Sequence, residues 1–183
     1  MRVIAGVARS LPLKCPAGTQ VRPTTDRIKE TLFNILQNDV PGAVFVDVCA
    51  GSGAIGIEAL SRGAKKAYFI EKDKNALAVI EDNLKFTKLD HKASVIKGDV
   101  LGALHSVRED EAHLIFIDPP YHEGLEEGIF QELSNMKYVT KDTLIVLEAE
   151  LDKETDFLQN TEFEVIREKR YKTNKHLFIQ YKK

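Results

Sequence analysis

The 183-residue sequence contains no tryptophan, only two cysteines, and no apolar run near the roughly 18 residues that cross a bilayer. Two cysteines, Cys15 and Cys49, are too few for a disulfide framework or a zinc site. The five histidines lack the spacing of metal ligands. No apolar signal-peptide core follows Met1. We therefore expect a cytoplasmic protein that uses no membrane segment and no metal.

A strong net charge of either sign is also absent, because 26 Lys and Arg residues face 28 Asp and Glu residues. The basic residues are nevertheless unevenly placed. Residues 1–29 and residues 163–183 each carry a net charge of +5, which leaves −12 for the segment between them. Two basic ends around an acidic middle suit a polyanion held at one rim of the molecule, although simply solvated termini give the same pattern.

From residue 43 onward, apolar strand-like runs alternate with helical patterns. Such alternation is typical of a doubly wound parallel sheet, and two final runs joined by a short polar link predict an antiparallel hairpin. The sequence therefore predicts an α/β, Rossmann-like domain with a mostly parallel sheet and a C-terminal antiparallel hairpin. The predicted strands are 43–48, 67–71, 94–99, 114–117, 143–148, 163–171 and 176–181.

The N-terminal part of the sequence has a different character. Residues 1–23 are rich in basic residues, Gly and Pro, and predict a basic extension with a short β-ribbon or arm. We place the main domain at residues 24–183. Its first helix is capped by Thr24 or Thr25, and its apolar face recurs at Ile28, Leu32 and Leu36.

A glycine motif, Gly51-x-Gly53-x-x-Gly56, stands between a predicted strand and a predicted helix. Glycines let the backbone approach a ligand closely, and the third one allows tight helix packing. Glu71 ends the next strand, 20 residues after Gly51, where an acid can accept hydrogen bonds from ribose hydroxyls. These features alone are also compatible with a nicotinamide-dependent dehydrogenase.

Two further acids favour S-adenosylmethionine as the ligand. Asp47 lies within the first strand, where it can orient the loop or reach a methionyl amine through water, whereas its charge would repel a pyrophosphate. Asp99 follows the third strand and is placed to accept from an adenine amino group. With Glu71 and Asp118 they give one acid at or near the end of each of four successive strands, and capping alone explains four of them poorly.

The run Leu114-Ile115-Phe116-Ile117 leads into Asp118-Pro119-Pro120-Tyr121. Four apolar residues before such a breaker are typical of a buried parallel strand, so Asp118 is expected at a carboxyl end, where open α/β sheets bind ligands. The two prolines remove backbone donors, which leaves carbonyls free to accept hydrogen bonds. A strand followed by a tight turn with an exposed aromatic ring gives the same pattern.

These motifs together resemble those of class I S-adenosylmethionine-dependent methyltransferases that modify exocyclic amines. Residues 2–6 and 22–34 further resemble the bacterial 16S rRNA guanine-N2 methyltransferases of the RsmD family, and the similarity covers essentially the whole chain. The resemblance implies S-adenosyl-L-methionine as cofactor and guanine 966 of 16S rRNA as target. It also implies, as a partner, a small-subunit assembly particle, on which we expect the protein to act as a monomer.

The motifs and the resemblance define three groups of expected site residues. The expected catalytic residues are Asp118, Pro119, Pro120 and Tyr121. The expected cofactor-binding residues are Asp47, Ala50, Gly51, Ser52, Gly53, Gly56, Glu71, Asn75, Asp99 and Val100. The expected RNA-binding residues are Arg2, Arg9, Arg22, Thr24, Arg27 and Lys29.

The expected chemistry follows from the weak nucleophilicity of an amine whose lone pair is delocalised into a base. If Asp118 and the Pro119 carbonyl each accept one N–H, the lone pair is directed at the methyl group, and Tyr121 stacks on the unstacked base. Asp-Pro-Pro-Tyr serves adenine amines equally well, so a DNA adenine-N6 methyltransferase is the alternative enzyme. A catalytically silent RNA-binding module is the alternative of another class.

Overall fold

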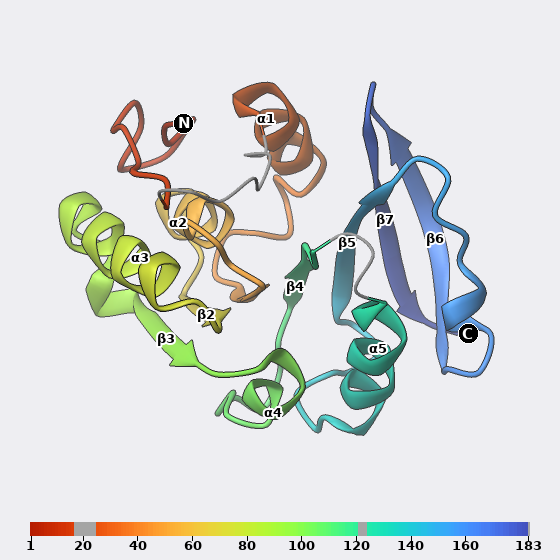
Figure 1. Cartoon of the computed structure of the whole chain (residues 1–183). Coiled ribbons are helices and arrows are strands. Elements are labelled where there is room, and N and C mark those ends of the chain that lie inside the picture. The colour runs from red at the N-terminus through yellow and green to blue at the C-terminus, as the bar shows by residue number, and fades with distance from the viewer. Residues whose placement is uncertain (17–24, 121–123, 183) are drawn as a thin grey trace.

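The computed structural model describes residues 1–16, 25–120 and 124–182 of the chain. Its centre is a seven-stranded sheet with the strand order β3-β2-β1-β4-β5-β7-β6 (Figure 1). The strands are β1 (Val44–Val48), β2 (Lys66–Glu71), β3 (Ala93–Lys97), β4 (Leu114–Ile117), β5 (Leu144–Glu150), β6 (Phe163–Arg170) and β7 (Asn174–Tyr181). The helices are α1 (Asp26–Ile35), α2 (Ala54–Ser61), α3 (Lys74–Thr87), α4 (Val100–Leu104) and α5 (Leu125–Asn135).

The sheet has the predicted topology. Strands β1 to β5 are parallel, β7 joins β5 in the antiparallel sense, and β6 pairs only with β7 along the outer edge. The strand order reverses between β1 and β4, and a crevice at such a switch point is where doubly wound sheets bind ligands. The mostly parallel α/β fold with a C-terminal antiparallel hairpin is therefore confirmed.

Two apolar layers cover the two faces of the sheet. On one face, side chains of α1, α2 and α3 pack with Phe45, Phe116 and Phe178 of the strands. On the other face, α4 and α5 pack against Ile115 and Leu177. Alternate residues of a strand point to opposite faces, so the face of any strand residue can be assigned by register to one of these two layers.

The described part of the basic extension, residues 1–16, packs on α2 rather than standing away from the domain. Val3, Ala8 and Leu13 are buried in the layer formed by α1, α2 and α3. The expected β-ribbon is reduced to a single antiparallel bridge between Arg2 and Pro12. The predicted boundary between extension and domain, at residues 23 and 24, lies outside the described residues.

The ends of several elements follow local capping and pairing. Thr25 caps α1 by accepting a hydrogen bond from the Ile28 backbone N–H, which agrees with one of the two predicted caps. Thr24 lies outside the described residues. Strand β5 continues two residues beyond its predicted end because Ala149 and Glu150 pair with β7.

Candidate active site

The loop between β1 and α2 contains the first two glycines of the motif. Gly51 has φ +55, in the left-handed region, and a Cβ atom added there would meet nothing within 4 Å. Its backbone N–H donates to Glu71 Oε2 at 2.8 Å. Gly53, the residue directly before α2, has φ +74, and a Cβ atom added there would lie 3.3 Å from Ile80 Cγ1. At Gly51 the loop therefore presents bare backbone to open space, which is what a closely approaching ligand requires.

Gly56 has a different role from the loop glycines. It lies inside α2, and a Cβ atom added there would fall 2.4 Å from Cε1 of the buried Phe69 ring on β2. The residue is therefore needed for close packing of α2 on the sheet, as the motif predicts for its third glycine.

Asp47 is buried beneath the loop, with 2% of its surface exposed. Its Oδ2 atom accepts a hydrogen bond of 2.8 Å from the Gly56 backbone N–H. Burial raises the pKa of Asp47 to about 8, the Gly56 N–H opposes this rise, and the Glu71 charge adds to it. In this structure the carboxyl group orients the start of α2, and its contact with a ligand through water stays a prediction.

Asp47→Asn is expected to weaken the pH dependence of folding stability. The folded-state pKa of about 8 exceeds that of an unfolded Asp, so the stabilising contribution is complete below about pH 4 and is lost as pH rises through 8. The loss is at most about 1.4 kcal/mol per pH unit. Urea unfolding of both proteins between pH 5 and 9 measures it, and parallel stability curves for the two proteins would contradict the prediction.

Glu71 connects the glycine loop to the start of α3. Besides Gly51, its carboxylate accepts backbone N–H groups of Lys72 at 2.8 Å and Asp73 at 2.9 Å. The side chain is half-buried, and Oε2, which among the described residues accepts only the Gly51 N–H, keeps acceptor capacity for a ligand. Asn75, in the first turn of α3, is exposed. If Glu71 binds a ribose, its carboxylate must therefore accept the ribose hydroxyls in addition to these backbone N–H groups.

Asp99 marks the carboxyl-end side of β3, directly before α4. It is exposed, and its carboxylate makes no hydrogen bond with any residue that the structure describes. Val100, the first residue of α4, is buried. The Asp99 carboxylate is thus free to accept a hydrogen bond from a ligand at this edge of the sheet.

Asp118 directly follows β4 and adjoins the end of β1, where its backbone N–H donates to the Val48 carbonyl at 3.3 Å. Pro119 is buried and Pro120 is exposed, while Tyr121 lies outside the described residues. The Asp118 side chain is half-buried and forms no hydrogen bond within the described part of the chain. Burial raises its pKa well above the usual range, and the charges of Glu148 and Asp47 raise it further.

A polar cluster on the two strands beyond β4 was not predicted from the sequence. The last pair between β4 and β5 is Ile117 with Leu147, so Asp118 and Glu148 follow next to each other, and Glu148 pairs with His176 of β7. Glu148 accepts a hydrogen bond of 2.7 Å from Asn174 Nδ2 and contacts His176 Nε2 at 3.2 Å. The Tyr171 hydroxyl contacts His176 Nδ1 at 3.0 Å. Glu148 also stands near the end of a buried strand, so the pattern that selected the other acids could have found it.

Some of the residues expected to bind RNA are exposed in the structure, and others are buried or lie outside the described residues. Arg9 and Arg27 are exposed, and Arg2 Nε lies 3.2 Å from Asp26 Oδ2. Arg22 and Thr24 lie outside the described residues. RNA binding by the exposed residues stays a prediction.

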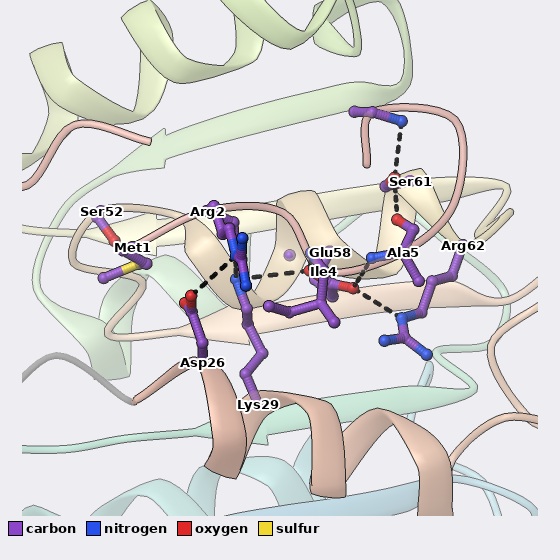
Figure 2. A network of polar contacts seen from close by, with 12 residues as sticks. Met1, Arg2, Ile4, Ala5, Asp26, Lys29, Ser52, Glu58, Ser61 and Arg62 are labelled. Atoms are coloured by element: carbon purple, nitrogen blue, oxygen red, sulfur yellow. Dashed lines mark hydrogen bonds and ion pairs between the residues drawn. The ribbon is translucent and has the colours of Figure 1, made fainter. Parts of the chain in front are cut away.

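Lys29 requires a correction. Its side chain is fully buried, and its Nζ atom donates to the Arg2 carbonyl at 2.6 Å and lies 3.5 Å from Glu58 Oε2 (Figure 2). The expectation that Lys29 contacts RNA is therefore wrong, because the ammonium group joins α1 to α2 and the N-terminal segment inside the protein. Burial lowers its pKa, and the nearby Glu58 and Asp26 charges oppose this.

Comparison with known proteins identifies the family. The sequence model of a family described as conserved hypothetical protein 95 matches residues 1–180. Ribosomal RNA small subunit methyltransferase D of Haemophilus influenzae is 38% identical over 156 residues, which cover 84% of this chain and 80% of that protein. The chain belongs to the RsmD family.

Solved structures agree with the family assignment. The structure of a hypothetical protein from Thermus thermophilus is 30% identical, covers 97% of this chain and 98% of its own, and gives a TM-score of 0.82. A precorrin-6y C5,15-methyltransferase from Geobacter metallireducens, 20% identical over 90% of this chain and 92% of its own, shares the fold with a TM-score of 0.69. The RsmD-family chain thus has a class I S-adenosylmethionine-dependent methyltransferase fold.

The described residues fit the cofactor of this fold. The space above Gly51 admits a ligand at the loop, and the free Asp99 carboxylate matches an amino group. Among the residues that the structure describes, no group of His, Cys, Asp and Glu side chains has a metal-binding arrangement. None of the described helices is both long and apolar enough to span a membrane.

Proposed function

We propose that this RsmD-family protein transfers a methyl group from S-adenosyl-L-methionine to the exocyclic N2 amine of a guanine in small-subunit rRNA, with guanine 966 as the family target. The observation that carries the proposal is the Asp118 carboxyl group, which stands beside the glycine loop without a hydrogen bond to any described residue. The name of the Haemophilus influenzae relative, a ribosomal RNA small subunit methyltransferase, supports the choice of RNA.

In the proposed mechanism, Asp118 and the Pro119 carbonyl accept the two N–H groups of the amine. These acceptors direct the nitrogen lone pair and stabilise the positive charge that develops on nitrogen. S-adenosylmethionine supplies the methyl group on a positively charged sulfur. Asp118 or water then accepts the proton that the methylated nitrogen loses. Tyr121 is proposed to stack on the base once the base has left its RNA stack.

Arg2, Arg9, Arg22, Thr24 and Arg27 are proposed to contact phosphates of the RNA. The first turn of α1 supports a role for this region, because free backbone N–H groups at a helix N-terminus favour anions. Lys29 is excluded from this group because its ammonium group is buried.

The pH dependence of activity is expected to show that neighbouring charges raise the pKa of Asp118. A protonated Asp118 is a weaker acceptor and has no charge to stabilise the positive charge that develops on nitrogen, so kcat/KM is expected to rise with pH through the raised pKa of Asp118. Glu148→Gln removes a charge that raises this pKa, so the acidic limb of the profile is expected to move to lower pH. Glu127→Gln, an exposed change on α5, is the control and should leave the limb in place. An unmoved limb in Glu148→Gln would contradict the proposed coupling.

The decisive experiment is methyl transfer from labelled S-adenosylmethionine to 16S rRNA that lacks its modifications, followed by nucleoside analysis. N2-methylguanosine is the expected product. N6-methyladenine, or incorporation into DNA in preference to RNA, would overturn the proposed substrate, and absence of cofactor binding would overturn the reaction itself.

A further inference from the structure

A β-bulge in the edge strand β6 changes the face to which its side chains point. Val165 pairs with Ile179 of β7, but Arg167 pairs with Phe178, so Ile166 is an extra residue between them. Ile179 belongs to the layer of α4 and α5, whereas Phe178 belongs to the layer of α1, α2 and α3. The bulge therefore turns Arg167, Lys169 and Tyr171 onto the face that carries Asp118, as bulges beside active sites often do.

Contacts confirm this change of face. The Arg167 guanidinium lies over the Phe178 ring, 5.5 Å from its centroid. The Tyr171 ring packs edge-on against His176, with centroids 5.0 Å apart. Lys169 lies between Arg167 and Tyr171 in the sequence and pairs with His176. Since His176 also contacts the Phe116 ring of β4, all of these side chains share the Asp118 face.

Arg167 and Lys169 form a basic strip on β6. A row of neighbouring residues that crosses the strands connects this strip to the proposed methyl-transfer site. The row starts at Asp118, one residue beyond the last β4–β5 pair, and continues through the neighbouring Glu148 to its pairs His176 and Lys169. Three strand spacings of about 4.8 Å place the strip roughly 14 Å from Asp118. Helix α1 and the turn between β6 and β7 lie at the same end of the strands, at the top of the view (Figure 1). A strand of RNA whose target base reaches Asp118 would thus have the strip beside its neighbouring nucleotides.

The charges of the strip are available to an outside partner. Arg167 is exposed and Lys169 is half-buried, and neither forms an ion pair with a carboxylate in the described ranges. On the opposite face of the same strand, Arg170 pairs with Glu168 at 3.1 Å. Stacking on Phe178 also restricts the Arg167 guanidinium, so less side-chain freedom is lost when it binds a phosphate.

We propose that Arg167 and Lys169 bind RNA phosphates that flank the target base, so that β6 forms a second RNA-binding wall apart from the N-terminal basic residues. The inference rests on the proposed function, because it takes small-subunit rRNA as the occupant. RNA is favoured by the charge of the strip and by its place in the row that begins at Asp118.

The test compares binding of unmodified 16S rRNA by the whole protein and by the double variant Arg167→Gln/Lys169→Gln over a range of salt concentrations. Loss of two phosphate contacts is expected to reduce the slope of log K against log salt by about 1.4 to 1.8 and to weaken binding roughly tenfold. Lys137→Gln/Lys141→Gln removes two exposed charges from the connection between α5 and β5, which precedes the amino end of β5. This control should leave the slope unchanged.

A charge-retaining variant, Arg167→Lys/Lys169→Arg, separates electrostatics from packing. It is expected to keep the wild-type salt slope. If it loses the slope as fully as the glutamine variant, or if the glutamine variant keeps the wild-type slope, the phosphate role of β6 is wrong. If the wild-type protein itself does not bind the rRNA, the proposed function fails instead.

Discussion

Asp118→Ala is expected to lower the rate of methyl transfer by about 10³-fold, because it removes both an acceptor that positions the amine and a group that stabilises the developing charge. Cofactor binding is expected to stay within a few-fold of wild type. Among the described residues, the glycine loop is held by hydrogen bonds from the Gly51 N–H to Glu71 and from Asn83 Nδ2 to the Ser52 carbonyl, and neither involves Asp118. Single-turnover transfer and equilibrium binding of S-adenosylmethionine measure the two effects separately.

Folding provides a control for this result. Burial beside Glu148 and Asp47 raises the pKa of Asp118, so its removal relieves an unfavourable environment, and the unfolding temperature should not fall. Asp110→Ala removes an exposed acid just before β4, at the opposite edge of the sheet, and should leave the rate unchanged. A rate within about tenfold of wild type in Asp118→Ala would exclude the catalytic role assigned to this residue.

Glu58→Gln is expected to lower the free energy of unfolding by about 3–5 kcal/mol, the usual range for breaking a buried ion pair on one side. Glu58 is fully buried on α2, and its carboxylate accepts the backbone N–H groups of Ile4 at 2.8 Å and Ala5 at 3.0 Å (Figure 2). It also accepts from Arg62 Nε at 2.8 Å. An amide has only one acceptor oxygen, so the change leaves buried donors, including Lys29, without their partner.

A second substitution tests whether the Lys29 ammonium, which among the described residues keeps only the Arg2 carbonyl as a partner, causes this loss. Lys29→Met alone should cost less than Glu58→Gln, because Glu58 keeps Arg62 and two backbone donors. In the double variant the buried ammonium is gone, so the combined loss should be smaller than the sum of the single losses. Urea unfolding measures all three. Strict additivity would show that Lys29 and Glu58 do not interact energetically, and a loss below about 1 kcal/mol for Glu58→Gln would place the pair among weak ion pairs.

Local rules account for the parts of the site that could be predicted. Strand β4 is a short apolar run that ends at Asp118 and two prolines, and both signals depend only on neighbouring residues. Gly56 was likewise predictable, because the third glycine of a strand-to-helix motif is the one that allows close helix packing. Its contact with Phe69 confirms the rule.

Long-range pairing accounts for the parts that could not be predicted. Lys29 lies near other basic residues at the start of a helix, which is the pattern of a surface residue. In the structure it forms an ion pair with Glu58, which is 29 positions away in the sequence. Similarly, nothing near Glu148 in the sequence indicates that the antiparallel return of β7 brings His176 opposite it. Hydrophobic periodicity does not specify which buried charges become partners.

By itself the sequence determined the alternation of strands and helices, the glycine loop, the acids at the strand ends and the Asp118 motif, because these depend on local periodicity, capping and backbone restriction. Only the tertiary structure decided that Lys29 is buried, that Glu148 and His176 extend the row beginning at Asp118, and that a bulge turns Arg167 toward that face. These features depend on register between distant strands, where a shift of one residue exchanges the two faces of the sheet.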